Sequence, residues 1–104
     1  MSRSESLAAY LRAQARRLLD RVEINDGGRN ARSALALFDT AAYAACLPDD
    51  DPLILQLDEA GCFGPLGCEE FDPGQAGFRL IRDWPGGEPH ELLLALPAAI
   101  KASA

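Results

Sequence analysis

The sequence predicts a single α+β domain, in which an N-terminal helical hairpin and a short third helix pack on a C-terminal antiparallel β-hairpin. Three observations predict this fold. Apolar residues recur at helical spacing through the first 22 residues, a Gly-rich corner follows them, and two apolar segments near the C-terminus are separated by a short Pro/Gly loop. Because 104 residues leave room for one core, we expect residues 1–104 to form one domain.

The first helix has the clearest signals. Ser2 followed three residues later by Glu5 fits a capping box, so the helix should begin near Ser4. It should end before residues 25–28, Asn-Asp-Gly-Gly, where glycine can adopt the left-handed conformation that closes a helix. On a helical wheel its apolar residues share one stripe about 120° wide: Leu7, Ala8, Leu11, Ala15, Leu18, Leu19 and Val22.

The second helix is expected from about Ala31 to Cys46. Asn30 can cap its start, and Pro48 ends it because proline cannot continue a helix. Small or apolar residues occupy nearly every side of this segment. Helices of that composition are usually surrounded by other elements, so we expect this one in the middle of the fold.

Residues 52–60 can be read as a strand, because their leucines alternate, or as a short helix. Asp51 is a good N-cap, Pro52 suits the first helical position, and Gly61 suits the residue after the end. This punctuation favours the helix.

The C-terminal third is predicted to form the β-hairpin. Residues 61–77 are dense in Gly and Pro and indicate an irregular connection, after which residues 77–84 and 90–96 form two arms. The second arm alternates Leu92, Leu94 and Leu96. A helix over residues 88–101 is the alternative, but Pro97 in its interior would cost about 3 kcal/mol, which favours a strand followed by one helical turn.

Charge is unevenly distributed along this acidic chain, whose formal net charge is −6. Residues 1–32 hold seven arginines against four acids, a net of +3, whereas residues 33–104 hold three basic residues against twelve acids, a net of −9. The asymmetry indicates a basic helix resting on an acidic body, or head-to-tail contact between copies. The overall sign disfavours nucleic acid as a partner.

Several observations indicate a cytoplasmic protein. No apolar segment approaches the ~20 residues of a membrane span, and the N-terminus lacks the features of a signal peptide. The chain has three cysteines, whereas a secreted disulfide scaffold normally has a larger and even number. The dominance of arginine over lysine and the many alanines suggest a GC-rich bacterial genome.

The stripe on the first helix has two interpretations: a core-facing helix with a solvated rim, or the interface of a dimer or a complex. Arginines flank the stripe on both sides, so they do not form a single basic ridge. A membrane-surface helix is disfavoured because the rest of the protein is acidic. The candidate interaction residues are Leu7, Leu11, Arg12, Arg16, Leu18 and Val22.

The cysteines provide a weaker candidate site. Five residues separate Cys62 and Cys68 in a Gly/Pro-rich loop, a looser spacing than the close pairs of zinc sites. A metal would also need His90 and a fourth ligand such as Cys46 or Glu69. Ordinary thiols explain the pattern better, so we expect no metal and no cofactor.

Nothing in the chain forms a recognisable catalytic constellation. His90 is flanked by acids but has no nucleophile at a defined spacing, and no nucleotide-binding or hydrolase motif is present. Asp39 falls on an apolar side of the second helix, where Arg79 or Arg82 could form a buried ion pair with it. An unrecognised ligand site around these three residues is a further hypothesis.

The corner before the second helix is a final candidate. Arg29 and Arg32 stand at a helix start, where free N–H groups and guanidinium groups could hold an anion, although the same residues also suit an ordinary turn.

The sequence therefore favours a non-catalytic protein–protein interaction module, either homodimeric or an acidic inhibitor of the immunity-protein type. The alternative is a small metal- or thiol-redox-dependent protein that uses Cys62 and Cys68.

Overall fold

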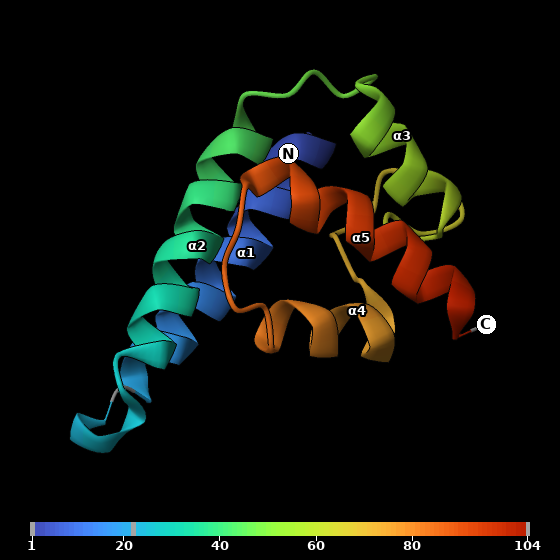
Figure 1. Ribbon diagram of the computed structural model, residues 1–104. Coiled ribbons are helices and arrows are strands. Elements are labelled where there is room, and N and C mark those ends of the chain that lie inside the picture. The colour runs from blue at the N-terminus through green and yellow to red at the C-terminus, as the bar shows by residue number, and fades with distance from the viewer. Residues whose placement is uncertain (1, 22, 104) are drawn as a thin grey trace.

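Helices make up the ordered elements of residues 2–21 and 23–103, the part of the chain that this computed structural model describes (Figure 1). The α-helices are α1 (Arg3–Asp20), α2 (Arg29–Ala45), α3 (Pro52–Glu59), α4 (Gly74–Arg82) and α5 (Pro89–Ala102), and one turn of 3₁₀ helix, η1, lies at Ile24–Asp26. These residues contain no strand. The predicted α+β class, with its C-terminal antiparallel β-hairpin, is therefore wrong.

The N-terminal helical hairpin consists of α1 and α2. The Ser2 hydroxyl accepts a hydrogen bond from the backbone N–H of Glu5 at 3.1 Å, so the capping signal placed the start of α1 correctly. The cap of α2 differs from the prediction, because Gly28 in the left-handed conformation (φ +77°) precedes the helix. The side chain of Asn30 instead donates to the carbonyl of Arg21 at 2.9 Å, which ties the two helices together at the corner.

The short helix α3 follows its sequence signals closely. The Asp51 side chain accepts from the N–H of Leu53 at 3.0 Å, and Pro52 is the first helical residue. Gly61, at φ +88°, lies just after the helix in the conformation that glycine adopts without strain.

The segments predicted as hairpin arms are helical: residues 77–82 belong to α4 and residues 90–96 to α5. In α5 a capping box joins Glu88 and Glu91, with the N–H of Glu88 donating to the Glu91 carboxylate at 3.0 Å. The buried side chains of α5 are spaced as on one face of a helix: Leu92, Leu93, Leu96 and Pro97. Burial of three leucines, at about 1.5–3 kcal/mol each, offsets the cost of an interior proline.

Helix α5 lies at the centre of the fold and packs against α2, α3 and α4, while α1 packs against α2 and α4. The buried core includes Leu7 and Leu11 of α1, Leu37 of α2 and Phe63 of the loop after α3. The hairpin of α1 and α2 extends past the other helices, and the molecule measures 44 × 28 × 21 Å (Figure 1). None of the helices in the described residues combines the length and the apolar composition that crossing a bilayer requires.

Candidate protein-binding surface

Most of the apolar stripe of α1 lies inside the molecule, although Leu19 is 45% exposed. Leu7 and Leu11 have no exposed surface and Leu18 is buried, so these candidate interaction residues belong to the core between the helices. Arg12 is half-buried and Arg16 is exposed at the rim of this contact. Val22 lies outside the described residues. In the structure, Leu7, Leu11 and Leu18 of the stripe face the core.

A different surface, the outer face of α2, is exposed. We define it by the residues Leu35, Asp39, Ala42, Tyr43 and Cys46, all of which are exposed. Leu35 retains 63% of its surface. Between Leu35 and Cys46 this face carries one charged residue, Asp39, and the exposed Arg32 lies on the same side one turn before Leu35. The apolar composition of α2 on nearly every side predicted a helix in the middle of the fold, whereas the structure leaves this side of α2 exposed.

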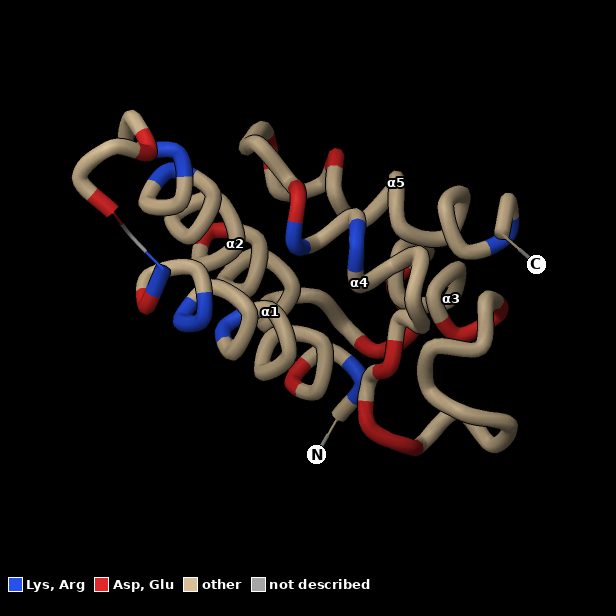
Figure 2. Tube along the Cα trace, turned by 90° about the horizontal axis from the view of Figure 1, so that it is seen from below, with Lys and Arg blue, Asp and Glu red and all other residues tan. Residues whose placement is uncertain are grey.

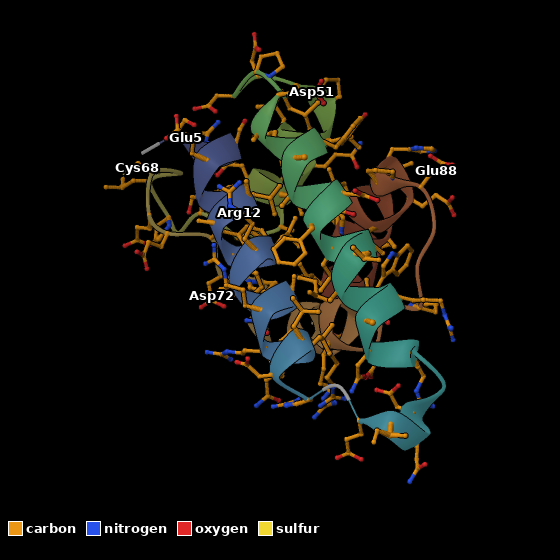
Figure 3. The ribbon with its side chains drawn as sticks, turned by 90° about the vertical axis from the view of Figure 1, so that its left-hand side faces the viewer. Glu5, Arg12, Asp51, Cys68, Asp72 and Glu88 are labelled. Atoms are coloured by element: carbon orange, nitrogen blue, oxygen red, sulfur yellow. The ribbon has the colours of Figure 1, made fainter. Side chains whose placement is uncertain are left out.

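No other described helix covers this face. Figure 1 shows α1 and α2 as one side of the molecule, and Figure 3, viewed from that side, shows both helices in front of the remaining elements. Leu19 on α1 and Ile24 at the tip of the hairpin are also exposed. The hairpin thus presents several large apolar side chains to solvent, a property of surfaces that bind another protein.

The two ends of α2 differ in charge. Arg29 and Arg32 are exposed in its first turn, and Asp49 and Asp50 are exposed shortly after its end. In Figure 2 basic residues lie along α1 and around the start of α2, with acidic residues beside them at the hairpin tip, and further basic residues lie on α4 and at the end of α5. Acidic residues also gather on the loops at the opposite end of the hairpin. The outer face of α2 therefore lies between a basic and an acidic region.

The cysteine and histidine candidates are spread over the fold. All three cysteines are free; Cys62 is buried, whereas Cys46 and Cys68 are exposed. His90 is exposed in the first turn of α5. Within residues 2–21 and 23–103, no three His, Cys, Asp or Glu side chains form a group able to hold a metal ion. The structure thus does not assemble Cys62, Cys68 and His90 into a metal site.

The expected ion pair of the second helix is not assembled either. Asp39 is exposed on the outer face of α2, and Arg79 is exposed on α4. Arg82 forms its ion pair with the neighbouring Asp83, at 3.0 Å between Nε and Oδ1. Asp39 was expected on an apolar side of α2, near the side chains that face the core. Its side chain is instead exposed to solvent.

A hollow of about 700 Å³ lies between α1, the loop after α3 and the start of α4. Its lining includes Cys62, Tyr10 and three exposed acids, Glu69, Glu70 and Asp72. Burial raises the pKa of the Cys62 thiol to about 11, with Asp72 and Asp58 adding to the effect. The thiol is therefore protonated at neutral pH and is a poor nucleophile.

The described residues thus show an exposed apolar helix face bordered by opposite charges, and they show no paired nucleophile and base. An exposed apolar helix face of this kind can bind a protein surface. No family model matches this chain, and comparison with curated proteins and with solved structures likewise gave no match.

Proposed function

We propose that this protein is a non-catalytic interaction module that binds a second copy of itself through the outer face of α2. The observation that carries the proposal is the exposure of Leu35, Ala42, Tyr43 and Cys46 along a helix face with one charge. A helix that is apolar all round is normally covered on every side. In one molecule α1 and α5 cover only the inner side of α2.

Charge complementarity supports a second copy as the occupant. In an antiparallel pairing of two α2 helices, Arg29 and Arg32 at one end lie opposite the partner's Asp49 and the partner's Asp50. A two-fold axis repeats this contact at the other end, so both favourable interactions form twice. The one charge on the face, Asp39, lies near the middle, where it weakens the association by repelling the same residue of the other copy.

A basic partner protein is the other occupant that this acidic chain suits, as in an acidic inhibitor. The self-complementary charges favour the second copy. Three free thiols support a reducing compartment, and we propose the cytoplasm as the location. The thiol-redox alternative has less support, because Cys62 is buried and protonated.

The test is light scattering during size exclusion, over a range of protein concentrations and at about 0.05 and 1 M salt. We expect a dimer at low salt that dissociates more readily at high salt. Leu35→Asp should give a monomer with unchanged helix content by circular dichroism. Leu94→Asp is the matched control, because Leu94 is 49% exposed on α5, away from the proposed interface. A monomer at every concentration and salt, or a dimer that survives Leu35→Asp, contradicts the proposal.

A further inference from the structure

A second hollow, of about 550 Å³, lies where the start of α2 meets the end of α4. It is lined by residues from both elements, including Arg29, Arg32 and Ser33 from α2 and Arg82 and Asp83 from the end of α4. Its volume falls within the range of about 300–1,000 Å³ typical of small-molecule sites. It is separate from the outer face of α2, which consists of other residues of that helix.

The lining of this hollow is basic although the protein is acidic. The lining includes three arginines and one aspartate, which give a local charge of +2 in a chain of net charge −6. Arg82 is held in place by Asp83, to which its Nε and Nη2 each donate at 3.0 Å. Arg32 is held by a hydrogen bond from Nη1 to the carbonyl of Gly27 at 2.9 Å. Each guanidinium has five N–H donors, so both arginines retain donors for a ligand.

Ser33 adds a hydroxyl group to the lining of the hollow. The residue is 7% exposed, and none of the side-chain hydrogen bonds of the described residues involves its hydroxyl. Thr40, on the same side of α2, donates its hydroxyl to the carbonyl of Ala36 at 2.8 Å. Among the described residues, Nε1 of Trp84 is the one buried side-chain polar atom without a partner, so the Ser33 hydroxyl is open to the hollow and is available to donate to a bound group.

The residue before α2 is held by Asp26. The Asp26 carboxylate accepts from the N–H of Gly28 at 2.7 Å, and its backbone hydrogen bonds, chiefly with Glu23, lower the pKa of Asp26. The side chains that line the hollow make the site testable by substitution.

We propose that this hollow binds the phosphate group of a small phosphomonoester or free phosphate. The guanidinium groups of Arg29, Arg32 and Arg82 approach it from two helices, and the Ser33 hydroxyl donates to one of its oxygens. Guanidinium groups bind phosphate oxygens through paired, charge-assisted hydrogen bonds. A phosphomonoester carries nearly two negative charges at neutral pH, which matches the local charge of +2.

The test is a titration of the full chain with inorganic phosphate and with phenyl phosphate, at low ionic strength, followed by calorimetry and amide chemical shifts. We expect saturable binding of one equivalent, with the shifts centred on the start of α2 and the end of α4. Tighter binding of phenyl phosphate identifies an ester as the ligand class, and equal binding identifies free phosphate.

Four variants sharpen the test. Arg29→Gln should weaken binding by about tenfold and Ser33→Ala by about threefold, because each removes a donor to the anion. Asp83→Asn should tighten binding, because it removes the one negative charge of the lining and frees Arg82. Arg16→Gln is the matched control: it removes an exposed arginine of α1 outside the hollow and should leave affinity unchanged.

Three results would overturn the proposal: no saturable binding at millimolar phosphate, equal losses for Arg16→Gln and Arg29→Gln, or unchanged affinity in Ser33→Ala. The second result would mean diffuse attraction to arginine in place of a built site. The hollow lies within one chain, but the proposed dimer pairs Arg29 and Arg32 with acids of the second copy. The monomeric Leu35→Asp variant should therefore bind phosphate at least as tightly as the unsubstituted chain.

Discussion

Ser4 and Asp49 join the start of α1 to the loop between α2 and α3. The Asp49 carboxylate accepts from the backbone N–H of Ser4 at 3.3 Å and lies 3.2 Å from its hydroxyl, which also donates to the carbonyl of Leu47 at 2.6 Å. The backbone N–H of Arg3 donates to the other oxygen of Asp49 at 3.3 Å. One carboxylate thus satisfies two otherwise free N–H groups in the first turn of α1.

Asp49→Ala should destabilise the protein by about 1 kcal/mol, as loss of a helix cap does. Partial burial alone would raise the pKa of Asp49, but the hydrogen bonds from Ser4 and Arg3 outweigh it and lower the pKa below 3.8. The contribution of Asp49 is therefore present above about pH 4 and is lost as pH falls through its folded-state pKa.

Urea unfolding at pH 7 and at acidic pH values well below 3.8 measures this effect. Asp50→Ala is the control, because Asp50 is an exposed neighbour of the same charge. Equal losses for the two variants at pH 7 would contradict the capping role of Asp49.

Leu93→Ala and Leu94→Ala distinguish a helix from a strand at residues 90–96. Leu93 is fully buried, so its truncation should cost about 2–5 kcal/mol, whereas Leu94 is half-exposed and its truncation should cost under about 1 kcal/mol. Thermal or urea unfolding of the two variants measures the difference. A strand with Leu92, Leu94 and Leu96 on its inner face would reverse the order.

Gly67→Ala should cost about 2–3 kcal/mol of stability. Gly67 is buried at φ +72°, and a Cβ there would lie 2.6 Å from Nη2 of Arg3 and 2.9 Å from Oδ1 of Asp58. These two side chains form an ion pair at 3.4 Å, and Nε of Arg3 donates to the carbonyl of Gly67 at 2.7 Å. The substitution therefore strains the backbone and separates both contacts.

The control for Gly67→Ala is Gly27→Ala, with a similar φ of +67° and no atom within 4 Å of the added Cβ. It should show the backbone cost alone, about 1 kcal/mol, by urea unfolding. Equal effects of the two substitutions would show that the contacts around Gly67 contribute nothing.

The three thiols should differ in reactivity. In the Leu35→Asp variant, where the outer face of α2 is uncovered, Cys46 and Cys68 are exposed and should react rapidly with a thiol reagent at pH 8. Cys62 is 1% exposed and its pKa is raised to about 11, first by burial and then by Asp72 and Asp58, so it should react slowly. Two rapid equivalents in this folded variant and three in denaturant are expected. Three rapid equivalents in the folded variant would show that Cys62 is accessible.

The local signals in the sequence were sufficient for the first three helices. Ser2 with Glu5, and Asp51 with Pro52, act within one helical turn, and the interactions they form do not depend on the rest of the fold. The periodicity of α1 likewise predicted a stripe of which most residues are buried, although Leu19 is 45% exposed. Periodicity left open whether this stripe contacts the core or a partner, because it identifies the apolar side of a helix without identifying what covers it.

The sequence by itself determined the hairpin of α1 and α2, the short α3 and the unequal distribution of charge, because capping, turn chemistry and periodicity are local. Tertiary structure decided the state of residues 74–102, where alternating leucines and Pro97 favoured a strand by local rules. Packing of Leu92, Leu93 and Leu96 against three other helices outweighs the cost of one interior proline. Tertiary structure also decided that α2 keeps one side exposed and that Ser33 and Arg82 line the same hollow. Both depend on how segments far apart in the chain pack together.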